Sequence, residues 1–276
     1  MTTAAPTDPT FALAPPDRPA GPVATALAVA RRTVRKFART PQLLVVSTVQ
    51  GAMFLLIFRY VFGGAISAGS VPYVDFLVPG FVVTSVLFAG MGAATGVAED
   101  VEGGFFDRLR SLPVARWALV SGRALADTGL VTWGLAVTVA IGFLVGFRLH
   151  GDTAEALAAF GLCVVFGFAF TWVFICIGLQ AGSAQAAQGM ALLVFPLTFV
   201  SSAYVPVASM PGWLQAFAEH QPITPMVDAV RCLAVGDPAL VGLDGSTTHY
   251  VTAALLWSAA LVVVFAPLAV ARYRRG

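Results

Sequence analysis

Residues able to do chemistry are few in this chain, and they are scattered. The only lysine, Lys36, follows Arg35 rather than the glycine of a phosphate-binding loop, where a lysine would reach the phosphates of a nucleotide. None of the three histidines stands in an HExxH spacing, and none of the three cysteines in a CxxC spacing. We therefore expect no ATP hydrolysis, no metal site and no disulfide in this chain, so an ATP-driven activity would need a separate ATPase.

Carboxylates gather at one place only, Glu99, Asp100 and Glu102. We expect these three to be solvated at a membrane surface, where they would not form the converging acid and base groups of an active site. The chain is therefore expected not to be an enzyme, and to hold no cofactor of its own. We also expect no nucleic-acid partner.

Long uncharged runs decide the class of protein. The chain is 58% hydrophobic and 11% charged with a mean hydropathy of +0.84, whereas soluble domains carry about 25% charged residues. A helix needs about 20 apolar residues to cross the hydrocarbon core of a bilayer. We predict an all-α polytopic membrane protein with six transmembrane helices, at residues 43–62, 74–98, 119–147, 155–179, 187–205 and 249–271.

One uncharged run is too long for a single crossing. Ala156 to Ala218 spans 63 residues, or about 95 Å as a continuous helix. It must fold back, and the polar stretch from Gln180 to Gly189 is the expected turn. This run therefore supplies the fourth and fifth predicted spans.

Cationic residues are unevenly distributed around these spans. Six precede the first span, and three follow the sixth. Four more, Arg108, Arg110, Arg116 and Arg123, lie between the second span and the inner end of the third. The loops of the other side hold only Arg148 and Arg231. The positive-inside rule therefore predicts that both termini are cytoplasmic.

The N-terminal segment is expected to lie outside the bilayer. Residues 1–22 are rich in Pro, Ala and Thr, which favours a disordered cytoplasmic tail. Over residues 23–41, Leu27 and Val34 fall near one face and arginines recur every four residues, which predicts an amphipathic helix on the anionic inner leaflet. The alternative is a solvated basic leader.

Ionisable residues are rare within the predicted spans. Arg59 and Asp75 lie near the outer ends of spans one and two, and either form a salt bridge or reach the interface independently. Asp127 follows Arg123 by four residues, so the two can pair on one helix face. Nothing here resembles a proton relay.

The stretch EDVEGGFFDRLRSLPVAR, residues 99–116, concentrates charge between spans two and three. We read Gly103-Gly104 as a turn. Phe105, Leu109 and Leu112 then recur at helical spacing and form an apolar stripe, while Pro113 ends the element. Such a short amphipathic helix could fit a groove on a cytoplasmic partner, and the alternative is an ordinary charged loop.

These residues resemble a known family. EGGFFDRLRSLPVAR is similar to the sequence between spans two and three of type-two ABC exporter permeases, in particular the daunorubicin-resistance type. YVFGGAI at residues 60–66, FLVPG at 76–80 and QPITPMVDAVR at 221–231 resemble the same group in the same order. The resemblance covers about residues 25–276, with Gln221 standing where the family usually has asparagine.

The resemblance implies a permease domain over residues 42–276 that works as a dimer, expected to be a homodimer, in a bacterial plasma membrane. Two copies of a separate ABC-type ATP-binding subunit would bind ATP and Mg²⁺. The stretch between spans two and three would be the coupling helix received by that subunit, and residues 211–233 an outer hairpin of short helices. The implied coupling residues are Glu99, Asp100, Glu102, Gly103, Phe105, Asp107, Arg108, Leu109, Arg110 and Pro113.

The implied cargo is an amphiphilic or hydrophobic drug, antibiotic or lipid. Aromatic and methionine side chains suit such a cargo, because they are apolar and methionine is adaptable. We expect the path to be lined by uncharged residues of spans one, two and five: Phe54, Phe81, Thr84, Phe88, Met91, Phe195, Phe199 and Tyr204. A second possible function is a membrane-bound lipid-modifying enzyme or assembly factor that ATP does not drive.

Overall fold

The computed structural model describes residues 21–39, 53–62, 72–110, 115–237 and 243–275, and every regular element in these ranges is a helix. Four of the helices are long and apolar enough to cross a membrane. They are α3 (Tyr73–Glu102), α5 (Arg116–Leu144), α6 (Thr153–Gln180) and α11 (Thr247–Arg275). They correspond to four of the six predicted spans.

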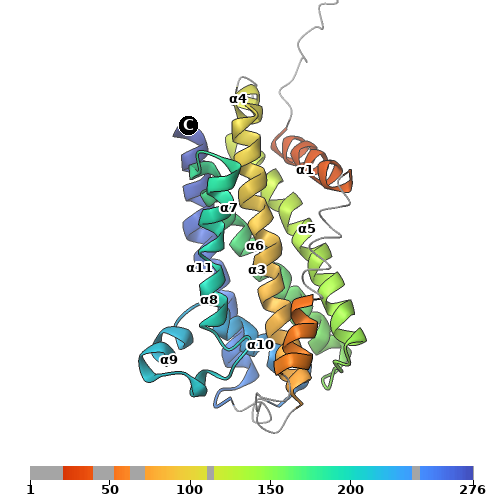
Figure 1. Ribbon diagram of the computed structural model, residues 1–276. Helices are drawn as coiled ribbons and strands as arrows, with labels where there is room; N and C mark the ends of the chain where they lie inside the picture. Colours follow the sequence, from red (N-terminus) through yellow and green to blue (C-terminus); the bar gives the residue numbers. More distant parts are fainter. Residues whose placement is uncertain (1–20, 40–52, 63–71, 111–114, 238–242, 276) are drawn as a thin grey trace, which may run out of the picture.

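The long helices form a bundle (Figure 1). Helix α6 packs against α3, α5 and α11, and α3 also packs against α5. Helix α6 starts with a capping box, in which Asp152 accepts from the Glu155 amide and Glu155 accepts from the Asp152 amide. Its aromatic side chains then fill the core: Phe166, Phe170 and Phe174 are all buried.

The two ends of the bundle differ. Helix α1 (Pro22–Ala38), helix α4 (Phe105–Arg110) and the C-terminus lie at one end, the top in Figure 1. The short helices α9 (Gly212–Glu219) and α10 (Ile223–Val235) lie at the opposite end, after the 3₁₀ turn η2 (Val207–Ser209). The cation-rich segments, from which the positive-inside rule predicted the cytoplasmic side, thus lie together at the α1 and α4 end.

The stretch predicted as the fifth span is divided into two short helices. Helix α7 (Ala184–Leu192) starts at Ser183, whose side chain accepts from the Ala186 amide. Two turn residues separate it from α8 (Phe195–Phe199), after which the chain leaves the helical conformation. Of the predicted first span only residues 53–62 are described, with 53–57 α-helical and Phe58–Phe62 forming the π-helix η1. Six crossings therefore stay a prediction.

The outer-end charges are arranged differently from the predicted salt bridge. Asp75 is buried, and its carboxylate lies 3.9 Å from Nε2 of His150. The Arg59 guanidinium lies over the Tyr60 ring at 5.3 Å, and its Nη1 is buried without a hydrogen-bond partner. Among the described residues, Arg59 and Asp75 are therefore not paired.

Helix α3 passes very close to the segment that follows α8. A Cβ atom at Gly80 would overlap the backbone carbonyl of Ala203. We expect Gly80→Ala to destabilise the fold by about 1–3 kcal/mol, because the clash is with backbone, which cannot rotate away. Thermal unfolding in detergent checks this. Gly92→Ala in the same helix is the control, since its Cβ would meet nothing within 4 Å; an equal loss in both would contradict the close approach.

Candidate functional site

A buried charge network joins α1, α3 and α5. Arg123 donates to Asp100 at 2.5 Å, to Asp127 at 2.7 Å and to the Gly96 carbonyl at 3.2 Å. Asp100 also accepts from Arg32 of α1 at 3.0 Å. Arg123, Asp100 and Asp127 are all buried, so the bonds among these three residues are shielded from water and salt, whereas Arg32 is exposed. The predicted pair of Arg123 and Asp127 is confirmed.

The expectation that the three carboxylates are solvated is wrong for Asp100, which is only 4% exposed. It is enclosed because α1 and α5 supply arginines from both sides. Glu99 is exposed and pairs with Lys36 of α1 at 2.7 Å. Glu102 accepts a hydrogen bond from the Ala184 amide at the start of α7. The acidic end of α3 thus contacts α1, α5 and α7.

The chain turns after α3 at the predicted glycine pair. Gly103 follows the last residue of α3, and Gly104 has φ +63°, a left-handed conformation that favours glycine. Helix α4 follows directly. Its Phe106 is buried and meets the Tyr273 ring of α11 edge-on at 5.2 Å, while Arg32 lies 3.6 Å from the centre of the Phe105 ring.

The predicted apolar stripe is therefore partly used within the chain. Phe105 and Leu109 pack against a cluster that includes Val97, Phe106 and Tyr273. The sequence analysis did not name Phe106 as a contact residue, because its neighbour Phe105 has the helical spacing to Leu109 and Leu112. The sequence offered no sign of its partner on α11.

Among the remaining predicted coupling residues, only Arg108 has a side chain that the structure describes, and this side chain is exposed. The side chains of Asp107 and Arg110, and all of residues 111–114 with Leu112 and Pro113, lie outside the described part of the chain. Contact of this segment with an ATPase stays a prediction.

Five aromatic rings from three segments form a continuous row. Phe58 of η1 stacks on Tyr204 at 4.9 Å, and Tyr204 lies 5.0 Å from Phe199. Phe199 continues to Phe195 at 5.0 Å, and Phe195 to Phe88 of α3 at 5.6 Å. We call these five residues the aromatic row. Four of them were predicted path residues, and Phe58 was missed.

The other predicted path residues have different surroundings. Thr84 is buried and accepts a hydrogen bond from the Tyr204 hydroxyl at 3.0 Å, which fixes that ring at the row. Phe81 is buried in the core and Met91 packs against this core, whereas Phe54 is exposed. The structure thus brings Thr84 to the row and leaves Phe54 apart from it.

Helix α10 fixes the chain where it leaves α8. Arg231 is 1% exposed and donates to the Phe76 carbonyl, to the Ser202 carbonyl at 2.8 Å and to Asp228 at 3.0 Å. Its guanidinium also lies 3.8 Å from the centre of the Phe76 ring. Asp228 accepts in addition from the Ser202 hydroxyl at 2.7 Å. Arg231 is therefore not a surface loop cation: it lies on α10, within the stretch expected to form short helices, and it is buried against Phe76 of α3 and against Ser202.

Gln221 makes a second connection to the same segment. Its side-chain amide donates to the Val200 carbonyl at 2.7 Å and to the Leu197 carbonyl at 3.3 Å, at the end of α8. These carbonyls have lost their helical partners because α8 ends there. The QPITPMVDAVR stretch thereby holds the aromatic row in place from one side.

Comparison with known proteins adds a family to this geometry. The ABC-2 type transporter family matches residues 25–233, more than half of the chain. The chain belongs to this family. A daunorubicin resistance ABC transporter permease of Streptomyces coeruleorubidus is 34% identical to the chain, over 88% of the chain and 83% of the relative's own length. A probable doxorubicin resistance ABC transporter permease of Mycobacterium tuberculosis is 27% identical over 92% and 89%.

The protein is thus the membrane-spanning permease subunit of an ABC transporter. The family confirms the resemblance drawn from the stretch between spans two and three, and it favours transport over the alternative of a lipid-modifying enzyme. In the structure the described residues of this stretch, 99–110, lie where α1, α3, α5 and α11 meet. The permease therefore has the buried charge network at the α4 end of the bundle, and the aromatic row lies farther toward the α10 end.

Proposed function

We propose that this permease is half of an exporter that moves amphiphilic or hydrophobic compounds such as drugs, antibiotics or lipids out of the cell. Two protomers, as a homodimer, would assemble with two copies of an ATP-binding subunit, which binds ATP and Mg²⁺. The names of the two relatives, for daunorubicin and doxorubicin resistance, support a drug-like cargo.

The charge network carries the coupling part of the proposal. A force applied to α4 reaches α3 through the short turn at Gly103-Gly104, and it reaches α5 and α1 through Asp100. Buried, multiply bonded ion pairs have little freedom to slide, because each displaced charge would be left unpaired in a poorly solvated site. Movement of the ATP-binding subunit at Glu99–Pro113 would thus shift α1, α3 and α5 together.

The aromatic row supports the cargo part of the proposal. Phe199 is 41% exposed, so the row reaches the protein surface although Tyr204 is buried. Aromatic faces bind apolar and cationic rings through stacking and cation–π contacts. A path along Phe88, Phe195 and Phe199 would suit planar amphiphilic cargo.

The charge distribution and the exposed apolar side chains of α1 support an orientation of the permease in the membrane. In α1, Thr25, Val29 and Thr33 are buried, while Leu27 and Val34 are exposed and free to enter the headgroup region. We place α1, α4 and the C-terminus on the cytoplasmic side of a bacterial plasma membrane. Helices α9 and α10 are then on the outer side.

The test is ATP hydrolysis by the purified complex of the permease and its ATP-binding subunit in lipid nanodiscs, with and without daunorubicin. We expect daunorubicin to stimulate hydrolysis, and Phe199→Ala to reduce the stimulation severalfold while leaving the basal rate unchanged. Leu256→Ala, an exposed α11 residue away from the row, is the control. Absence of any co-purifying ATPase would overturn the proposal, and equal stimulation of Phe199→Ala would overturn the role of the row.

A further inference from the structure

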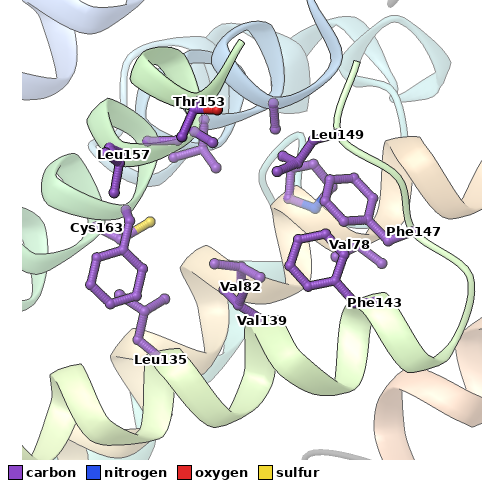
Figure 2. Close-up of a pocket in the computed structure, with 16 residues that line it drawn as sticks. Val78, Val82, Leu135, Val139, Phe143, Phe147, Leu149, Thr153, Leu157 and Cys163 are labelled. Carbon is purple, nitrogen blue, oxygen red and sulfur yellow. The ribbon is translucent and has the colours of Figure 1, made fainter. Parts of the chain in front are cut away.

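A pocket of about 230 Å³ opens between the helices at the α10 end of the bundle. Its walls come from α3, α5, α6 and α10, and Figure 2 shows side chains of α5 and α6 facing one another across it. The residues that matter below are Val82, Val139, Phe143, Leu157, Ala159 and Cys163. Apart from Thr153, which lies at the top of the view in Figure 2, the pocket is lined by apolar side chains and by Cys163.

The pocket is open on one side, between α5 and α6. Leu157 of α6 is 68% exposed and Phe143 of α5 is 38% exposed, whereas Val82 and Cys163 at the inner end are buried. Both α5 and α6 are long and apolar enough to cross a membrane, and Phe143 and Leu157 lie within the spans predicted from the sequence, so we expect lipid rather than water at the opening. An empty apolar cavity leaves its lining atoms without contact partners, which favours an occupant of the same chemistry.

A cation is fixed at the mouth of the pocket. Nη1 of Arg148 donates to the Phe143 carbonyl at 3.3 Å and to the Phe147 carbonyl at 3.1 Å, and both phenylalanines line the pocket. Arg148 is exposed, and within the described ranges it forms no ion pair with a carboxylate. A guanidinium carries five N–H donors, so the remaining ones are available to a phosphate.

We propose that this pocket binds a single phospholipid, with the part of one acyl chain nearest the glycerol between α5 and α6 and the phosphate on Arg148. The volume exceeds the roughly 150 Å³ of a cavity that binds benzene, but it lies below the about 300 Å³ at which drug-sized pockets begin. It therefore suits one hydrocarbon chain and is too small for a polycyclic drug.

The pocket is separate from the aromatic row. Val78 and Val82 of α3 face the pocket, whereas Thr84 and Phe88 lie on another face of the same helix. In the orientation proposed above, the lipid would come from the outer leaflet. It would hold α5 and α6 apart at α10, the helix that fixes the end of α8.

Native mass spectrometry of the full-length permease in detergent tests this, with palmitoyl-oleoyl phosphatidylethanolamine as the probe. We expect the unaltered chain to retain one lipid at concentrations where Ala159→Phe and Val139→Phe retain none, because each fills the pocket from a different helix. Ala158→Phe, one residue away and exposed, is the matched control and should bind as the unaltered chain does. If Ala159→Phe fails to fold, Val139→Phe decides.

A second experiment tests the contact between Arg148 and the phosphate. Arg148→Gln should weaken binding of phosphatidylethanolamine on the order of tenfold, the loss expected for a charge-assisted hydrogen bond. Binding of the matching diacylglycerol, which has no phosphate, should not change. Equal lipid retention by a folded pocket-filling variant would overturn the pocket as the site, and equal losses for both lipids in Arg148→Gln would overturn the phosphate contact.

Discussion

Replacing Arg231 by methionine is expected to unfold most of the permease. The methionine fills similar volume but leaves the Phe76 and Ser202 carbonyls without their donor and Asp228 buried without its cation. Removing one partner of a buried ion pair costs about 3–5 kcal/mol. Fluorescence-detected size exclusion after heating should show a large fall in the melting temperature or no folded peak.

Two variants give this prediction its controls. Arg116→Met removes an exposed arginine at the start of α5 and should leave the melting temperature nearly unchanged. The double variant Arg231→Met with Asp228→Asn should recover part of the loss, because it no longer buries an unpaired charge. A melting temperature for Arg231→Met equal to that of Arg116→Met would contradict the buried position of this arginine.

Asp100→Asn is expected to release α1 from the bundle. The neutral amide keeps the shape of the carboxylate but weakens its buried bond to Arg123, worth about 1.5–3 kcal/mol when a charged group takes part. It also weakens the bond to Arg32 of α1, which is worth less because water screens the exposed guanidinium. Helix α1 holds four basic residues at which trypsin cuts, Arg31, Arg32, Arg35 and Lys36, and Arg39 follows directly after it. Limited trypsin digestion in detergent should therefore cleave α1 several times faster.

The neighbouring carboxylate is the matched control. Glu99 makes an exposed pair with Lys36, and such surface pairs contribute about 0–1 kcal/mol. Glu99→Gln should therefore leave the digestion rate close to that of the unaltered chain. Equal acceleration by both variants would show that the buried network does not hold α1.

Local sequence spacing predicted the parts of the buried charge network that lie within one helix. Arg123 and Asp127 are four residues apart, so one helix face brings them together whatever the fold. The Gly103-Gly104 turn was predictable for the same reason. The bond from Arg123 to Asp100 joins two helices, and it depends on how α3 and α5 pack, which no spacing encodes.

The same distinction explains the errors. Arg231 looks like a loop cation by hydropathy alone, because its partners Phe76 and Ser202 are far away in sequence. Four members of the aromatic row were named as path residues because of their type, but the row itself was not predicted. It arises from the break between α7 and α8, which places Phe195 and Phe199 beside Phe88 and Tyr204. Phe58 was missed because its ring contact crosses to another predicted span.

The most direct test of the central claim is a cross-link from α4 to the ATP-binding subunit. The three native cysteines are buried, and burial raises the pKa of the Cys232 thiol to about 11, so an introduced surface thiol is the reactive one. Arg108→Cys in the assembled complex should couple to lysines of the ATP-binding subunit through a short maleimide–succinimide reagent. Trp213→Cys, on exposed α9 at the opposite end, should not. Coupling from position 213, or none from position 108 in an intact complex, would contradict the account.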